Sequence, residues 1–301
     1  MINLLTGFAE LVKSRVGLAN SKLVVAAAHD RDTLEAVYGA ADFFGLGYLL
    51  VGDGEKIKRF SDEMGRSPDG GSIVHSLDDE STAKTSVSII KDMTNGVLVK
   101  GMIETSTLLR AVVNKESGIR AEKTMSHVAF LELPSYHKLF AVTDGGMCQN
   151  PTLEQKADIV KNAVRMYRSI AGKGYEPKIA ALSASETVNP KLEESVHCAE
   201  LKKMAGDGEF GRVVFEGPIS FDLAASKKAA HKKGYDSPVC GDADIFLVPN
   251  ITTGNVFCKC LIEWAGAKMA GAILGAAAPI VLVSRAASAE EKLNSVALCI
   301  R

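Results

Sequence analysis

The sequence lacks an apolar run long enough to cross a membrane. The longest such run, residues 269–283, is shorter than the ~20 residues that a membrane helix requires, and it contains Pro279. Residues 1–17 have no basic start, and Glu10 and Lys13 interrupt their apolar pattern, so we expect an amphipathic helix there and no signal peptide. These features favour a cytoplasmic protein.

Metal-binding and redox motifs are also missing. The six cysteines are scattered, with no C-x-x-C pair and no histidine at a zinc-like spacing. Cys258 and Cys260 point to different sides of the expected helix. Asp242 and Asp244 precede a strand, but two acids without further ligands favour a loop over a metal site. We therefore expect reduced thiols and no metal site.

Neither sign of charge is in large excess, because the net charge is -1. Such a chain has no electrostatic footprint for nucleic acid or for an anionic membrane surface. The basic stretch at 227–233 is local and is typical of a solvated helix end. We expect neither nucleic acid nor membrane as a partner.

What the sequence does have is a regular alternation of strand and helix patterns. In its first part, four short apolar runs are each followed by a stretch with helical periodicity. These pairs are 23–28 with 32–44, 48–51 with 55–64, 73–75 with 80–93, and 97–99 with 105–115. Four β-α units in succession predict an α/β fold with a parallel, doubly wound sheet.

The pattern changes after residue 125. Strands at 127–133 and 139–143 are too close together for a crossover connection, so we predict an antiparallel hairpin. Alternation then resumes, with helices that include 221–231 and 256–264, and a last strand begins at Pro279.

A chain of 301 residues is long enough for two domains. We take the hairpin as the start of the second one. The predicted domains are residues 1–124 together with 279–301, and residues 125–278.

The segment Gly206–Gly211 matches G-x-G-x-x-G, the pattern of a dinucleotide-binding loop. Such a loop must follow a strand and open a helix, so that the pyrophosphate meets helix amides. Here the helix comes first and the strand second. We therefore predict a helix-to-strand turn.

Hydroxyl side chains and an arginine follow the strand that ends near Lys100. Thr105, Ser106 and Thr107 stand at the start of a helix, where free amides and the helix dipole favour an anion, and Arg110 lies about one turn further on. The alternative is that Thr105 or Ser106 simply caps the helix while Arg110 is solvated.

A second segment of this kind lies near the end of the chain. The apolar run 279–283 predicts a buried strand, Ser284 and Arg285 follow it, and Ser288 with Glu291 forms the pattern of a capping box at the start of the last helix. Glu290 has no capping role. Because ligands bind at strand ends in open α/β sheets, we predict that Arg110 and Arg285 hold one phosphate between them.

Asn255 and Lys259 are further candidates for substrate contact. Gly254 and Asn255 stand near an expected helix start, with Lys259 one turn along. These polar residues either cap that helix or face a cleft.

At these residues the sequence resembles the phosphate acetyl/butyryl transferases, and most closely the stand-alone phosphate butyryltransferases. The resemblance covers nearly the whole chain, in the same order. The segments that carry it are Lys100-Gly101, Thr105 with Leu108–Val112, Thr143-Asp144, Pro151–Leu153 with Gln155-Lys156, Glu186–Lys191, Glu216–Pro218, Gly241–Ile245, Gly254-Asn255 with Lys259, Ser284-Arg285 and Lys292–Ser295.

The resemblance implies the reaction acyl-CoA + phosphate ⇌ acyl phosphate + CoA, without metal or redox cofactor. It also implies two three-layer α/β/α domains with a cleft between them, similar to isocitrate and isopropylmalate dehydrogenases, and a homo-oligomer of at least two chains. By the same resemblance Ser284, Arg285 and Arg110 belong to the active site.

The resemblance leaves the base open between two carboxylates. The acetyl branch of the family places the acid that takes the thiol proton at Glu291, whereas butyryl-type chains place it at Glu290. Another departure is Cys148, where the family commonly has asparagine.

Three other functions share the expected fold. They are a phosphate acetyltransferase, a catalytically silent CoA-binding protein, and a decarboxylating dehydrogenase. The last needs metal carboxylates and a nucleotide site that the sequence does not show.

Overall fold

The computed structural model describes residues 5–17, 20–68, 72–282 and 287–300. The chain divides into two compact units. The terminal unit comprises residues 9–123 and 270–301, and the central unit comprises residues 1–8 and 124–269. The domain boundaries predicted from the sequence stay a prediction.

The terminal unit has a mixed sheet in the order β3-β2-β1-β4-β11-β10, in which only the β10–β11 pair is antiparallel among the described pairs. Its strands are β1 (Lys22–Ala26), β2 (Gly47–Gly52), β3 (Ile73–His75), β4 (Gly96–Lys100), β10 (Lys268–Leu274) and β11 (Ile280–Val281). Every residue of β4 is buried, as its apolar sequence predicts for a central strand.

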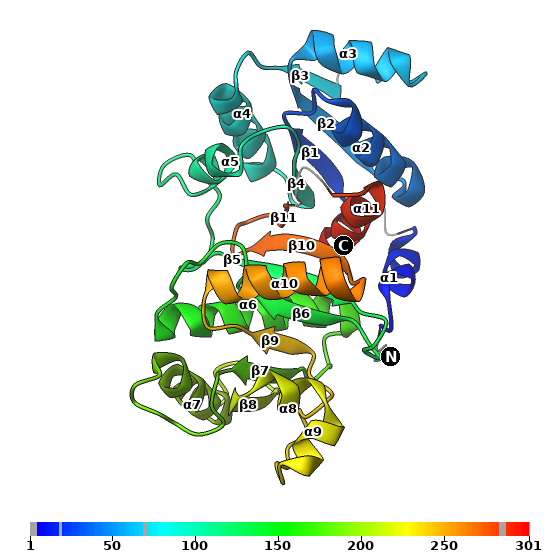
Figure 1. The fold of residues 1–301 in the computed structure, drawn as a ribbon. Coiled ribbons are helices and arrows are strands. Elements are labelled where there is room, and N and C mark those ends of the chain that lie inside the picture. The colour runs from blue at the N-terminus through cyan, green and yellow to red at the C-terminus, as the bar shows by residue number, and fades with distance from the viewer. Residues whose placement is uncertain (1–4, 18–19, 69–71, 283–286, 301) are drawn as a thin grey trace. The chain divides into compact units, whose positions relative to one another are not determined.

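Helices cover both faces of this sheet. They are α2 (Arg31–Phe44), α3 (Gly54–Glu63), α4 (Asp79–Lys91), α5 (Thr105–Val112) and α11 (Ala289–Cys299). Helix α1 (Phe8–Arg15) begins in the central unit and contacts α11, where Arg15 Nε donates to Ala297 O. Helix α2 packs with α3 and α11, whereas α4 packs with α5 (Figure 1). Asp30, Asp53 and Asp78 cap α2, α3 and α4 by accepting hydrogen bonds from first-turn amides, which fixes where these helices begin.

The central unit has the strand order β5-β6-β9-β7-β8. Its strands are β5 (Ser126–Glu132), β6 (Phe140–Thr143), β7 (Lys178–Leu182), β8 (Val214–Ile219) and β9 (Ile245–Leu247). The pair β5–β6 is antiparallel, so the predicted hairpin is confirmed, and the other described pairs are parallel.

The helices of the central unit are α6 (Leu153–Ala171), α7 (Glu193–Gly206), α8 (Phe221–Ala225), α9 (Lys227–Lys232) and α10 (Ile251–Ala265). Helices α6 and α7 pack together, whereas α10 lies on the other face in Figure 1. There Phe221 and Phe257, from α8 and α10, pack against Phe246 of β9, with ring centroids 5.9 and 6.4 Å away.

Two predicted helices of the central unit had wrong boundaries. The helix expected at 221–231 is divided at Ser226, whose extended backbone ends α8 and whose side chain accepts from Ala229 N to start α9. The helix expected at 256–264 begins at Ile251, because Asn250 accepts from Thr253 N and caps it earlier. The Gly206–Gly211 segment does join α7 to β8, as predicted.

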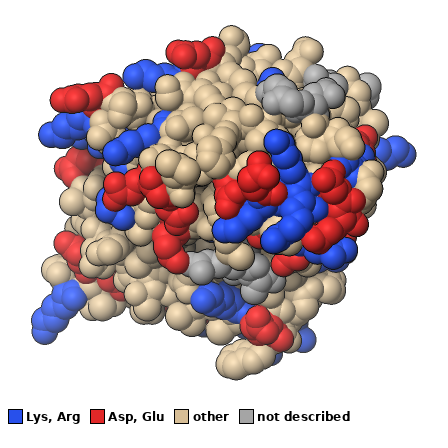
Figure 2. All heavy atoms as spheres, turned by 90° about the horizontal axis from the view of Figure 1, so that it is seen from above, with Lys and Arg blue, Asp and Glu red and all other residues tan. Residues whose placement is uncertain are grey.

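None of the described helices combines the length and the apolar character needed to cross a lipid bilayer. On the face drawn in Figure 2, lysine, arginine and acidic side chains are interspersed. Ion pairs such as Lys56–Asp53 and Arg59–Glu63 along α3 have the same mixed character.

Candidate active site

Strands β1 and β4 lie side by side at the point where the strand order of the terminal sheet changes direction. These strands are neighbours, yet the helices that follow them, α2 and α5, lie in different helical layers. Gly101 N donates to Ala26 O at 2.8 Å, and a side-chain carbon at Gly101 would lie 2.3 Å from Ala27 O. A crevice at such a reversal is where open α/β sheets bind ligands.

Helix α5, which follows β4, carries three hydroxyl residues in its first turn. Its N-cap is Glu104, whose side chain makes no capping hydrogen bond to the helix. The alternative that Thr105 or Ser106 caps α5 is therefore wrong, because both lie inside the first turn. Thr105, Ser106 and Thr107 thus combine hydroxyl groups with the amides of a helix N-terminus, which favours an anion.

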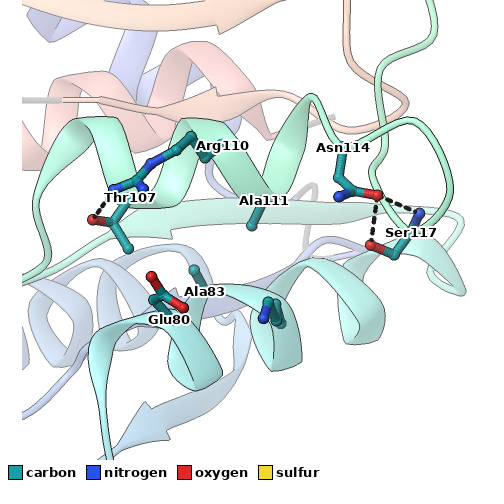
Figure 3. A pocket seen from close by; sticks show the side chains of 8 residues that line it. Glu80, Ala83, Thr107, Arg110, Ala111, Asn114 and Ser117 are labelled. Carbon is teal, nitrogen blue, oxygen red and sulfur yellow. Dashed lines mark hydrogen bonds between the residues drawn. The ribbon is translucent and has the colours of Figure 1, made fainter.

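Arg110 lies beside these hydroxyls, as predicted. Its Nε donates to Ser106 O and its Nη2 to Thr107 Oγ1, both at 3.3 Å. Arg110 also lines a pocket of about 190 Å³ between α5 and α4, where Glu80 and Lys84 lie on the α4 side (Figure 3). The side chain is exposed, so its guanidinium can contact a ligand.

The start of α11 carries the two candidate bases. Ser288 and Glu291 form a full capping box, with Ser288 N donating to Glu291 Oε2 at 2.8 Å and Glu291 N to Ser288 Oγ at 3.2 Å. Glu290 is exposed next to them. The structural role of Glu291 is confirmed, while Ser284 and Arg285 lie outside the described residues.

In the central unit, Asn255 and Lys259 lie on α10. Asn250 caps this helix, so the alternative in which Asn255 caps it is wrong. Asn255 Nδ2 instead donates to Gly145 O at 3.4 Å, and Gly254 lies so close to Gly145 that neither accommodates a side chain. Lys259 is exposed one turn further along.

Asp144 holds the loop that contacts Asn255, and the sequence did not identify it as a site residue. Its carboxylate accepts hydrogen bonds from the amides of His127, Gly146, Met147 and Cys148 at 2.8 to 3.2 Å. The sequence indications were its place in the Thr143-Asp144 segment, which carries the family resemblance, and the two glycines that follow it after a strand.

Cys148 lies in the same loop. Burial and the nearby Asp144 carboxylate raise the pKa of its thiol to about 12. A thiol in this state is not a nucleophile at neutral pH.

Lys156 and His197 form a second group, of which the sequence indicated only Lys156, as part of a segment that carries the family resemblance. Both line a pocket of about 360 Å³ in the central unit, and Lys156 Nζ lies 3.0 Å from His197 Nδ1. Burial lowers the pKa of each side chain, and the Lys156 charge lowers that of His197 further.

Asp242 and Asp244 are paired with lysines. Lys138 Nζ lies 2.9 Å from Asp242 Oδ1 and 2.6 Å from Asp244 Oδ1, and Lys178 also binds Asp242. Within the described ranges, no three His, Cys, Asp or Glu side chains are grouped so as to hold a metal ion.

Residues 80–300 match the family model described as "Phosphate acetyl/butaryl transferase". The chain belongs to this family. It is 41% identical to a probable phosphate butyryltransferase of Bacillus subtilis over 93% of both chains. It is 38% identical to a phosphate butyryltransferase of Clostridium acetobutylicum, over 98% of this chain and 97% of that one.

Among solved structures, the chain resembles a branched-chain phosphotransacylase from Enterococcus faecalis. The TM-score is 0.79 at 33% identity, covering 92% of this chain and 97% of that one. The predicted α/β fold is confirmed, but the sheet is mixed, with β10 and β11 antiparallel, where the first part of the sequence predicted a parallel sheet. The predicted family is confirmed as well, and with it the enzyme type, a phosphate butyryltransferase-type acyltransferase.

Proposed function

We propose that the protein interconverts acyl-CoA and phosphate with acyl phosphate and CoA, using short acyl groups such as butyryl. The observation that carries this proposal is the similarity, over nearly the full length, to two proteins named as phosphate butyryltransferases. The hydroxyl and guanidinium groups at the start of α5 offer the donors that a phosphate needs.

Arg110 and Arg285 bind the phosphoryl group, and Thr105, Ser106 and Thr107 add hydroxyl and amide donors. Two planar guanidinium groups neutralise the charge that collects on phosphate as it leaves. Arg285 follows β11 in the sequence, and β11 pairs with β4, the strand that leads to α5. Asn255 and Lys259 bind the substrate from the central unit.

The thiol of CoA attacks the carbonyl carbon of the acyl phosphate. The new carbon–sulfur bond replaces the carbon–oxygen bond to phosphate, the phosphate leaves with that electron pair, and Glu290 or Glu291 accepts the thiol proton. Because a free thiol has a pKa of about 8.5, a nearby base raises the reactive thiolate fraction at neutral pH. Ser284 donates a hydrogen bond to the thiol or to the developing oxyanion.

The finer architecture is also part of this proposal. The chain forms two three-layer α/β/α domains, 1–124 with 279–301 and 125–278, and binds its substrates in a cleft between them, as in isocitrate dehydrogenase-like folds. It assembles as a homo-oligomer of at least two chains.

The test is CoA release from acetyl-, propionyl-, butyryl- and branched-chain acyl-CoA in the presence and absence of phosphate. We expect phosphate-dependent release that is fastest with the four-carbon or branched acyl groups. Fastest release from acetyl-CoA would make the protein a phosphate acetyltransferase. Binding of CoA without release from any thioester would make it a silent CoA-binding protein.

A further inference from the structure

The pocket around Lys156 occupies the point where the central sheet reverses its winding. Strands β6 and β9 are neighbours, but β6 continues into α6 on one face and β9 into α10 on the other. The pocket is lined by the segments that follow both strands, including Thr152 and Asn250, and by the start of α7. This is the position at which open α/β sheets bind small ligands.

A buried ammonium group lines this pocket. Lys156 is 5% exposed, and its Nζ lies 3.0 Å from His197 Nδ1. When Lys156 is charged it donates to Nδ1, so the ring proton of His197 lies on Nε2. Together the two side chains offer donors to an acceptor group, and a negative charge bound there would offset the cost of keeping Lys156 charged while buried.

The first turn of α7 supplies both hydrogen-bond donors and carboxylates to the pocket. Its N-cap residue, Leu192, gives no side-chain hydrogen bond to the first amides, whereas Thr152 and Asn250 cap α6 and α10. The side chains of Glu193 and Glu194, at the start of α7, line the same pocket as His197. Donors and carboxylates therefore lie within one turn of each other.

The positive and negative charges that line the pocket nearly cancel, so neither a simple anion nor a simple cation fits it well. Three glutamates outnumber the one lysine, but three helix N-termini, each with roughly half a positive charge, offset much of this difference. A ligand with little net charge but with separated positive and negative groups fits this arrangement best.

We propose that this pocket binds a free α-amino acid as a zwitterion. The ligand carboxylate accepts from Lys156, from His197 and from the first amides of α7, and its ammonium group donates to Glu193 and Glu194. A pocket of about 360 Å³ is large enough for an amino acid and too small for an intact acyl-CoA. None of the residues that line it is among the acyl-transfer residues proposed above, and the proposal does not depend on that activity.

The test is isothermal titration of the full-length protein with free amino acids, each compared with the acid that lacks its amine and the amine that lacks its carboxylate. We expect at least one amino acid to bind at millimolar or lower concentration, and about tenfold or more tighter than both of its truncated analogues. Equal binding of an acid or an amine analogue would overturn the proposal, as would no binding of any amino acid.

Substitutions in the pocket test whether the amino acid binds there. Glu194→Gln, on the partly exposed start of α7, should weaken binding about tenfold, and Lys156→Met should abolish it. Glu55→Gln changes a first-turn glutamate of α3 in the same way and should bind as the natural protein does. Unchanged affinity in Glu194→Gln overturns the assignment, and this holds even if Lys156→Met fails to fold.

Discussion

At the scale of single residues, Glu290 and Glu291 differ in their position relative to the capping box of α11. Glu291 closes a capping box with Ser288, so its side chain has a structural role at the start of α11. Glu290 is its exposed neighbour in the same turn. The catalytic base must gain and lose a proton in each turnover, which would disturb a carboxylate that also caps a helix. This favours Glu290 over Glu291 as the base.

Replacing each glutamate by glutamine tests this assignment. If Glu290 is the base, Glu290→Gln should lower kcat for CoA release about a hundredfold or more. Glu291→Gln should retain most activity and the melting temperature, since glutamine also serves in a capping box. A larger loss of kcat in Glu291→Gln than in Glu290→Gln would assign the base to Glu291.

Arg110 can be tested through the phosphate dependence of the reaction. Arg110→Lys keeps the charge but loses the planar fork of donors, so we expect KM for phosphate to rise about tenfold. Because the side chain is exposed, the urea midpoint should hardly change. Arg59→Lys on α3 is the control, and an unchanged KM in Arg110→Lys would remove Arg110 from the phosphate site.

At the scale of elements, the close approach of the segment after β4 to the end of β1 limits which side chains that segment can carry. The backbone after β4 passes directly over Ala26 and Ala27. Gly101 is the residue that permits this approach, because a side chain there has no room beside backbone atoms that cannot move away.

Gly101→Ala should therefore destabilise the protein by about 3 kcal/mol, the upper part of the range for overpacking. The measurement is the free energy of unfolding in urea. Gly174→Ala is the matched control, since an added carbon there meets no atom within 4 Å. Equal stability of the two variants would show that the backbone at Gly101 relaxes freely.

The elements themselves were largely predictable, because local residues define them. The β-α alternation, the hairpin of β5 and β6 and the capping box of α11 all follow from short-range patterns. The errors occurred where one polar side chain decided a boundary. Ser226 divides α8 from α9, and Asn250 caps the start of α10. The apolar periodicity of the sequence does not predict either of these helix boundaries.

The candidate site was less predictable for a related reason. Arg110 meets Thr107 because they share one helix, which a sequence shows directly. Lys156 meets His197 across 41 residues, and Asp144 binds the amide of His127 across 17. Only the packing of separate elements creates these contacts, so the sequence did not indicate them.

At the scale of the whole molecule, stability depends on charges buried in the central unit. Lys138 is 1% exposed and is paired with both Asp242 and Asp244. Tyr167 and Tyr175 also donate to Asp244, so the network joins α6 to the start of β9. Removing one member of such a network leaves a buried charge without its partner.

We expect this network to make the protein sensitive to acid. Burial opposes ionisation of Asp242, but hydrogen bonds from Lys178, Lys138 and His137 outweigh it and lower the pKa of the carboxyl below its usual value. Its contribution to stability is therefore present above the unfolded-state pKa of about 3.9 and is lost as the pH falls towards the folded-state value.

Urea midpoints between neutral pH and about pH 3 check this expectation. Asp242→Asn should be less stable than the natural protein at neutral pH, and the difference should shrink as the pH falls below about 4. Asp236→Asn removes an equal charge from an exposed position, so subtracting its effect isolates the part due to pairing. A difference that stays constant over this range would contradict the argument.

The contact between Gly145 and Gly254 has a mechanical consequence. Because neither glycine has a side chain, the loop after β6 and the first turn of α10 are in direct backbone contact, with no side chain between them. A displacement of that loop is therefore passed on to the helix that carries Asn255 and Lys259. A small movement of the loop that Asp144 holds would therefore also shift Asn255 and Lys259, for which we propose substrate contact.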